Sequence, residues 1–318
     1  MNYPLVSVII PNYNRESLIA ETLDSILKQS YSHWECIVVD DGSTDDSETV
    51  VNLYHSKDNR ITFHKRPEHK PKGANACRNY GLELSKGKYI NWFDSDDLMG
   101  ENKLLKQVQA LETTKYSFSI CQSFVFENCI DNIIGLKSEK IYSENPFEDF
   151  ISKKIVIPVQ APIFNRAFLL KYNYNFDETL QAGQEWYFLA KILYYNPKFH
   201  AINEPLDYIR SHVHNISNHN TNDKYWYYFL ARLKLHKDLK HKLKDESILI
   251  LNIFYLFFFK QFVRTRNFTK AWFVWRKCLI NVKQLSIKEH FFLISGLLIY
   301  ILFNKGDGII SKVSLYNK

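Results

Sequence analysis

The stretch 91-NWFDSDDLM-99 places three carboxylates, Asp94, Asp96 and Asp97, directly after the apolar run Tyr89–Phe93. The apolar run predicts a buried strand. Carboxylates this close together repel and raise one another's pKa, unless a cation or hydrogen-bond donors compensate. Two interpretations follow: the acids lie in a solvated turn that begins a helix near Glu101, or they hold a metal ion.

Three earlier apolar runs also end in polar loops. The predicted strands are Leu5–Ile10, Glu35–Val39 and Arg60–His64, and the loops after them are 11-PNYNR-15, 40-DDGSTD-45 and 65-KRPEHKPKG-73. Helices are predicted between the strands, over Glu16–Gln29, from a cap at Ser43 or Thr44 to about Tyr54, and over Asn75–Leu84. Alternating strands and helices are typical of an α/β fold, here a mainly parallel sheet flanked by helices.

Ligands bind beyond the carboxyl ends of the strands in such a sheet, so these loops and 94-DSDD-97 are expected to meet in one site. Asp41 could accept hydrogen bonds from a base or ribose, while Asp94 and Asp96 could reach ribose hydroxyls and a divalent cation. Oxygen ligands favour Mg²⁺ or Mn²⁺, which would neutralise a departing diphosphate. Four basic residues of the third loop either meet phosphates or stay solvated: Lys65, Arg66, Lys70 and Lys72.

Taken together, 7-SVIIPNYNR-15, 29-QSYSHWECIVVDDGSTDDS-47, 78-RNYGLELSKGKYI-90 and 93-FDSDDL-98 resemble the family 2 glycosyltransferases. The resemblance covers about the first hundred residues, and it implies a Rossmann-like GT-A fold. It implies transfer of a sugar from a nucleotide diphosphate, usually a uridine one, with inversion at the anomeric carbon. Pro11 and Tyr13 would frame the base and Asp41 would contact it.

The same likeness implies a site for each part of the donor. Asp94–Ser95–Asp96 correspond to the DXD motif, and Arg78 lies in the usual ARN signature, although Cys77 replaces its alanine. The nucleotide-sugar site would comprise Pro11, Tyr13, Asn14, Arg15, Asp41, Lys72, Arg78, Asp94 and Ser95, and the Mn²⁺ or Mg²⁺ site Asp94, Asp96, Asp97 and His212.

Two later stretches are similar to further family segments. In 176-FDETLQAGQEWYFLAKIL-193, Glu185 aligns with an aspartate that is the usual catalytic base, and a glutamate can also accept a proton. Its alternative role is that of an exposed acid at the start of a helix. In 208-YIRSHVHNIS-217, His212 would approach the metal or the diphosphate, with His214 as a competitor and a surface histidine as the alternative.

The net charge of the chain changes sign near residue 220. Residues 223–318 hold 18 Lys/Arg and 6 Asp/Glu, a net charge of +12, whereas residues 1–222 hold 23 and 28, a net charge of −5. We expect a catalytic domain over 1–220, with a nucleotide-sugar half (1–100) and an acceptor half (101–220), and a basic, aromatic helical tail over 221–318. The tail either contacts an anionic membrane surface or packs as a helical subdomain.

Other features of the sequence bear on the cellular location of the protein and on its partners. The apolar runs Ile248–Phe259 and Phe291–Phe303 are shorter than the roughly 20 residues of a membrane span, so no spanning helix is predicted. The N-terminal MNYPLVSVII has no basic segment before its apolar one, so no signal peptide is expected. The five cysteines form no CxxC pair, which favours free thiols and a reducing compartment. No nucleic-acid-binding module accompanies the charge.

The sequence therefore predicts an inverting hexosyl- or N-acetylhexosaminyltransferase, acting from the cytoplasm at the inner face of a bacterial-type membrane. Its acceptor would be a saccharide or a lipid-linked saccharide in surface polysaccharide biosynthesis. The alternative is a non-catalytic sugar-nucleotide-binding or scaffold protein, which the altered Gln184–Glu185 site favours. Nucleotidyl transfer would need a glycine-rich phosphate loop, and 11-PNYNR-15 has no glycine.

Overall fold

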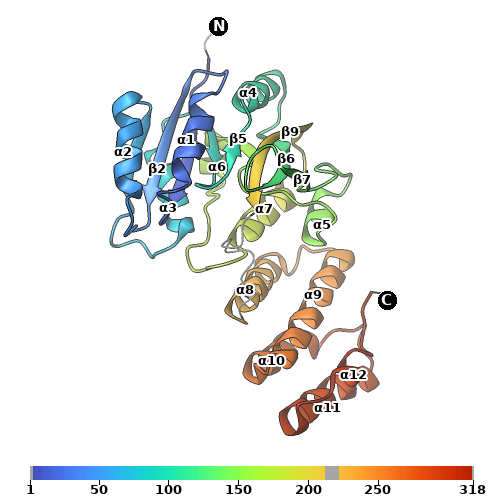
Figure 1. Cartoon of the computed structure of the whole chain (residues 1–318). Helices are drawn as coiled ribbons and strands as arrows, with labels where there is room; N and C mark the ends of the chain where they lie inside the picture. Colours follow the sequence, from blue (N-terminus) through green and yellow to red (C-terminus); the bar gives the residue numbers. More distant parts are fainter. Residues whose placement is uncertain (1–2, 212–221, 317–318) are drawn as a thin grey trace. The chain divides into compact units, whose positions relative to one another are not determined.

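The computed structural model describes residues 3–211 and 222–316. The chain forms two compact units, one of residues 1–179 with 184–215 and one of residues 180–183 with 216–318 (Figure 1). The predicted boundary at residues 220 and 221 lies outside the described residues. All five cysteines are free thiols, and Cys36 and Cys77 are buried, as expected for apolar positions of a strand and a helix.

The first four long strands of the larger unit form a parallel sheet in the order β3-β2-β1-β4. They are β1 (Val6–Asn12), β2 (Trp34–Asp40), β3 (Ile61–Lys65) and β4 (Tyr89–Trp92). The helices that connect them are α1 (Ile19–Leu27), α2 (Ser47–Lys57) and α3 (Ala74–Leu84). The predicted α/β alternation is confirmed, and each element lies within a few residues of its predicted position.

Both faces of β1, β2 and β4 are buried, which explains their continuous apolar runs, whereas β3 at the edge of the sheet is only partly buried. Val8, Val38 and Leu23 belong to a core cluster in which α1 and α2 cover one face, whereas Ile37, Val39 and Cys77 pack together on the other face under α3. The carboxyl ends of the strands therefore stay open between the two helical layers.

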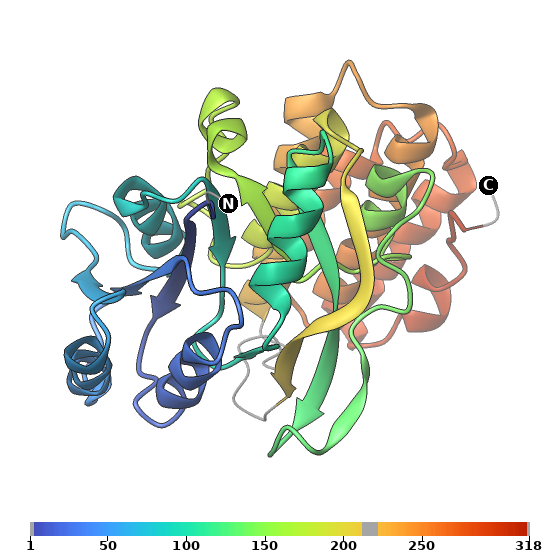
Figure 2. The same cartoon turned by 90° about the horizontal axis from the view of Figure 1, so that it is seen from above.

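The sheet continues beyond β4 with mixed strand directions (Figure 2). β8 (Pro162–Asn165) pairs antiparallel with β4 and with β6 (Phe118–Glu127), and β6 runs parallel to β9 (His200–Ser211). The short β5 (Leu98–Met99) and β7 (Ile133–Leu136) pair antiparallel with β9 and β6. The sheet is thus parallel in the first hundred residues and mixed as a whole. The remaining helices of this unit are α4 (Lys103–Thr113), α5 (Pro146–Ile151), α6 (Arg166–Lys171) and α7 (Gln184–Tyr195).

Gly81 lets α3 approach β1 closely. A Cβ at Gly81 would lie 2.2 Å from Cγ2 of Ile9, so a side chain there must displace the strand or the helix. We expect Gly81→Ala to lower the free energy of unfolding by about 1–3 kcal/mol. Urea unfolding would measure this, with Gly308→Ala as the control because nothing lies within 4 Å of its added Cβ. Equal stability of the two variants would contradict the close packing.

The second unit is helical, as predicted for the tail. Its elements are α8 (Asn222–Leu239), α9 (Asp245–Arg264), α10 (Phe268–Val274), a π-helical turn (Trp275–Leu279), α11 (Ile287–Phe303) and α12 (Asp307–Ile310). Phe229 of α8 and Phe258 of α9 pack with their ring centroids 6.0 Å apart. Among the described residues, α9 has the length and composition to cross a membrane, a property that core helices share, and half of its most apolar stretch is buried.

Candidate functional site

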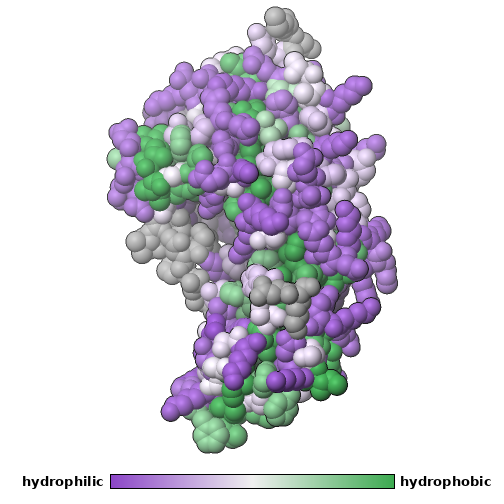
Figure 3. All heavy atoms as spheres, turned by 90° about the vertical axis from the view of Figure 1, so that its right-hand side faces the viewer, coloured by the Kyte–Doolittle hydropathy of each residue, from purple (hydrophilic) through white to green (hydrophobic). Residues whose placement is uncertain are grey.

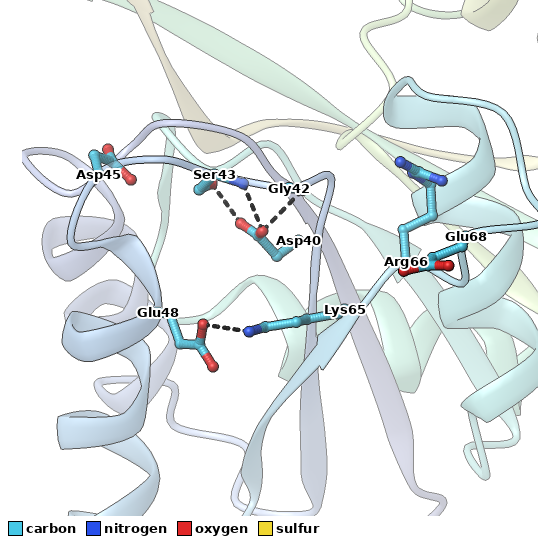
Figure 4. A pocket seen from close by; sticks show the side chains of 8 residues that line it. All are labelled: Asp40, Gly42, Ser43, Asp45, Glu48, Lys65, Arg66 and Glu68. Atoms are coloured by element: carbon cyan, nitrogen blue, oxygen red, sulfur yellow. Dashed lines mark hydrogen bonds and ion pairs between the residues drawn. The ribbon is translucent and has the colours of Figure 1, made fainter.

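The ends of β1 and β2 are tied together by hydrogen bonds of Asp40. The side-chain amide of Asn12 donates to Asp40 Oδ1 at 2.9 Å, and the backbone N–H groups of Gly42 and Ser43 donate to Asp40 Oδ2 at 2.9 and 2.8 Å (Figure 4). Gly42 has a φ of 89°, which favours glycine. The hydroxyl of Ser43 accepts from the backbone N–H of Asn14 at 2.9 Å, so the turn holds the first loop as well.

This arrangement corrects one prediction. Neither Ser43 nor Thr44 caps α2, whose N-cap is Asp46 without a side-chain cap bond. The Ser43 hydroxyl donates to Asp40 instead. A polar turn of this composition can cap a helix or brace its own loop, and here the Asp40 carboxylate competes successfully for the hydroxyl.

A cavity of about 290 Å³ lies against this turn. Its lining, drawn in Figure 4, comprises Asp40, Gly42, Ser43, Asp45, Glu48, Lys65, Arg66 and Glu68. The four carboxylates outnumber the two cations, so the cavity suits hydrogen-bond donors better than a phosphate.

The basic loop after β3 is engaged with carboxylates. Arg66 Nε lies 2.5 Å from Asp41 Oδ1, and Lys65 and Lys70 pair with Glu48 and Glu83 at 2.7 and 2.8 Å. Asp41, the predicted contact to the base, is thus held beside a largely buried guanidinium. Lys72 is exposed.

Arg78 is the centre of the site. Its Nη2 lies 2.8 Å from Asp94 Oδ1 and 2.8 Å from Glu185 Oε1, so it joins the end of β4 to the start of α7. The Arg78 side chain is 3% exposed, and its Nε and Nη1 have no hydrogen-bond partner among the described residues. Its guanidinium carbon lies 5.3 Å from the ring centroid of Phe176. Both Nε and Nη1 are buried, so Arg78 acts on its two carboxylate partners through Nη2.

The carboxylates around Arg78 differ in their surroundings. Burial raises the pKa of Asp94 to about 6; Arg78 opposes this shift, and the nearby charges of Glu185 and Asp96 add to it. Arg15 Nη2 lies 3.4 Å from Asp96 Oδ2, a long ion pair. Glu185 remains 38% exposed, so a substrate hydroxyl can reach it.

Asp97 turns toward the interior. Its carboxylate accepts hydrogen bonds from the side chain of Gln160 and, at 2.8 Å, from the backbone N–H of Arg210. Burial raises its pKa well above the usual value. The three acids of the opening stretch thus have two roles: Asp94 and Asp96 face the cations Arg78 and Arg15, whereas both oxygens of Asp97 brace the loop against β9. As a metal ligand, Asp97 would first have to give up these bonds.

The acids do not begin a helix. They occupy the turn between β4 and β5, and α4 starts at Lys103 with Asn102 as its N-cap. The described residues contain no group of three or more His, Cys, Asp or Glu side chains placed to hold a metal. Asp94 and Asp96 nevertheless fit a hard cation, because a Mg²⁺-type ion binds through one or two carboxylates plus phosphate oxygens. Its charge would favour the ionised form of Asp94, whose pKa is raised by burial and by the neighbouring carboxylates. His212 and His214 lie outside the described residues.

The sequence profile of the family described as "Glycosyl transferase family 2" matches residues 7–169. The chain belongs to this family. The match covers the parallel sheet and its connecting helices, the acid loop (residues 94–97), β6 and β8. Of the site residues whose contacts are described above, Phe176, Glu185 and Arg210 lie beyond it.

Several relatives are similar to part of this family 2 chain. A Bacillus subtilis protein named "Putative teichuronic acid biosynthesis glycosyltransferase TuaG" is 41% identical over 116 residues, 36% of this chain and 45% of the relative. An Escherichia coli protein named "UDP-Glc:alpha-D-GlcNAc-diphosphoundecaprenol beta-1,3-glucosyltransferase WfaP" is 40% identical over 121 residues, 38% of this chain and 47% of the relative. The matched segments thus span less than half the length of these relatives.

Solved structures show the same fold. Residues 1–349 of S. aureus TarS, in complex with UDP-GlcNAc, match 96% of this chain and 83% of that one with a TM-score of 0.62 and 21% identity. The mannosyltransferase PcManGT from Pyrobaculum calidifontis, in complex with GDP-Man and Mn²⁺, matches 100% and 89% with a TM-score of 0.57 and 18% identity. The predicted GT-A fold is confirmed.

Two residues that shape the site of this family 2 chain, Asn79 and Arg210, are not among the site residues predicted from the sequence. Asn79 donates to the Phe176 carbonyl and accepts from the Phe176 backbone N–H, each at 2.9 Å, and so fastens the segment before α7 onto α3. Phe176 then stacks on Phe188 of α7 with the ring centroids 4.2 Å apart. These contacts set the position of Glu185. The sequence does contain a signal for this role, because Asn79 directly follows Arg78 in the motif 78-RNYGLELSKGKYI-90.

The second missed residue is Arg210 of β9. Its Nε donates to the Asp96 carbonyl at 2.9 Å, and its Nη2 donates to Glu21 at 2.7 Å. Together with its backbone bond to Asp97, these contacts fix the acid loop between β9 and α1. The stretch 208-YIRSHVHNIS-217 contains Arg210, but the family resemblance points only to its histidines as site residues.

Proposed function

We propose that the chain is an inverting glycosyltransferase that moves a sugar from a UDP-sugar to a hydroxyl of a saccharide or lipid-linked acceptor in surface polysaccharide biosynthesis. One observation carries this function: Arg78 holds Asp94, from the predicted donor loop, and Glu185, the predicted base, at 2.8 Å each. This contact supports the proposal, because it brings the proposed donor-binding carboxylate and the proposed proton acceptor into one cluster.

The names of the similar proteins support the substrate classes. TarS was solved with UDP-GlcNAc, and the name of the E. coli relative specifies UDP-glucose and a diphosphoundecaprenol-linked acceptor. A lipid-linked acceptor would require the enzyme to work at the inner face of the cell membrane. The donor loops, including Asp41, Arg15 and Tyr13, would then bind the nucleotide on the cytoplasmic side.

In the proposed reaction, Glu185 accepts the proton of an acceptor hydroxyl while that oxygen forms a bond to the anomeric carbon. The bond from the anomeric carbon to the diphosphate breaks on the opposite face, so the configuration inverts. A divalent cation held by Asp94 and Asp96 would neutralise the departing diphosphate. Arg78 orients the Glu185 carboxylate through Nη2, and the same nitrogen holds Asp94 of the donor loop.

Nucleotide release tests this function. The purified chain should release UDP from UDP-GlcNAc or UDP-glucose, slowly alone and faster with a saccharide acceptor, in the presence of Mn²⁺. The altered Gln184–Glu185 pair favours the second candidate, a non-catalytic sugar-nucleotide-binding protein, which would bind UDP-sugars but release no UDP. Tight binding without any release across a donor and acceptor panel would favour that candidate.

Asp96 should carry the metal dependence. We expect Asp96→Ala to lower turnover about a hundredfold or more, because it removes a carboxylate that would hold the charge-neutralising cation. Asp131→Ala, at an exposed position, is the control. Rates measured with Mn²⁺, Mg²⁺ and EDTA would check this. Asp96 has no place in the metal site if the variant keeps the wild-type response to Mn²⁺.

A further inference from the structure

The helix α11 of the helical unit is apolar on two opposite sides. Leu293, Gly296 and Leu297 are buried on one side, and a Cβ at Gly296 would lie 2.3 Å from Cγ2 of Ile310 in α12. The other side is open to solvent. It carries Ile287, Phe291, Leu298, Ile301 and Leu302, which are 90, 66, 52, 49 and 71% exposed.

These five side chains form one stripe. At 3.6 residues per turn they fall within an arc of about 100°, and from Ile287 to Leu302 the stripe is about 22 Å long. A helix that is apolar all round is normally buried in a protein core or in a membrane, so an open apolar side calls for a partner. In the lower part of Figure 3, hydrophobic side chains lie next to hydrophilic ones on the face that is shown.

The sequence on either side of the stripe is predominantly basic. Residues 264–318 hold ten Lys/Arg and two Asp/Glu, a net charge of +8. Both acids are engaged: Glu289 forms a capping box with Ser286, and Asp307 pairs with Arg264 at 2.7 Å. The lysines near α11 are exposed, namely Lys277, Lys283, Lys288, Lys305 and Lys312.

We propose that this stripe of α11 lies in the interfacial layer of an anionic membrane, with the surrounding lysines on the lipid head groups. An apolar helix face with a basic rim matches both parts of such a surface. The choice of a membrane as partner rests on the proposed function, in which the acceptor is lipid-linked. The stripe would bring the chain to the surface that holds the acceptor.

A second copy of the chain fits this surface poorly. Pairing two stripes would bring two regions of charge +8 face to face. The stripe, about 22 Å by one helix width of about 10 Å, covers only roughly 200 Å², whereas a stable interface buries about 800 Å² on each partner.

Flotation of the full chain with lipid vesicles tests the membrane contact. The wild type should float with vesicles of phosphatidylglycerol and phosphatidylcholine, and much less with phosphatidylcholine alone or at high salt. The variant Phe291→Ser/Leu298→Ser/Leu302→Ser should lose about tenfold or more of its partitioning. A second variant, Lys283→Gln/Lys288→Gln/Lys305→Gln, should lose the preference for anionic vesicles.

The matched control is Leu53→Ser/Ile134→Ser/Leu170→Ser, which removes three apolar side chains of the other unit that are 57, 53 and 51% exposed. It should float like the wild type. The membrane contact would be overturned if the triple serine variant of α11 floated like the wild type, or if the wild type did not float. It would also be overturned if the wild type formed a dimer that this variant dissociates.

UDP release with a soluble acceptor should be the same in the α11 variant and the wild type. A wild type that floats but releases no UDP would count against the proposed function alone.

Discussion

Glu185→Gln is expected to reduce sugar transfer by about a thousandfold, within the range that positioned general bases contribute. The amide has nearly the shape of the carboxylate, and its carbonyl oxygen can still accept a hydrogen bond from Arg78. It cannot take up a proton at neutral pH. Nucleotide affinity should therefore stay close to that of the wild type, because Asp94 and Arg78 keep their 2.8 Å contact.

Initial rates of UDP release with acceptor, together with calorimetric titration of UDP, would separate the two effects. Glu178→Gln is a close control, since Glu178 lies in the same segment and accepts a hydrogen bond from Asn79 that its amide can also accept. Glu185→Asp should keep part of the activity, because the family usually has an aspartate at this position. A Glu185→Gln variant that still transfers sugar would place the base elsewhere. A large loss of UDP affinity would instead mean that Glu185 mainly holds Arg78 in place.

The parts of the site that local sequence determines could be predicted. The strands β1 to β4 are runs of mostly apolar residues, and a polar loop follows each run directly. The order of residues therefore predicts where each strand ends. It also predicts that the loops meet, because the ends of parallel strands lie at one edge of the sheet. The acids of 94-DSDD-97 follow their strand in the same way, and the family resemblance identifies them as a DXD motif.

Contacts between distant residues could not be read in this way. Asp97 differs from Asp96 because Gln160 and Arg210, 63 and 113 positions away, use its two oxygens. Nothing in the string DSDD distinguishes one aspartate from the next. The antiparallel pairing of β8 with β4 and β6 is equally non-local, and it makes the second half of the sheet mixed. The family likeness supplied Glu185, but only the fold shows that Arg78 connects it to Asp94.

Lys103 is the second residue for which we expect a large effect, this time on stability. Its side chain is fully buried at the start of α4, and Nζ lies 2.9 Å from the Asp207 carboxylate of β9 and 3.3 Å from Cys121 Sγ of β6. Burial lowers the pKa of the Lys103 ammonium, but the charges and hydrogen bonds of Asp207 and Cys121 together outweigh burial and raise it. The ion pair therefore joins a helix to two strands inside the protein.

Lys103→Met should lower the free energy of unfolding by about 3–5 kcal/mol, because it leaves the Asp207 carboxylate buried without a counter-charge. Thermal and urea unfolding would measure this. Lys106→Met is the control on the same helix: Lys106 pairs with Glu204 at the surface, where both side chains are more than a third exposed, and should contribute at most about 1 kcal/mol.

The double variant Lys103→Met/Asp207→Leu shows which cost dominates. If the loss comes from the unpaired charge, removing the carboxylate as well should recover most of the stability, because apolar residues of similar size often replace a buried pair without loss. If the double variant is as unstable as Lys103→Met, the positions themselves require polar groups, for which Cys121 and the Ala161 carbonyl are the neighbours.

Either unstable variant should also weaken UDP binding. Asp207 lies three residues before Arg210, whose backbone N–H holds Asp97 and with it the acid loop. Wild-type stability of Lys103→Met would mean that desolvation of the ammonium costs as much as the ion pair contributes.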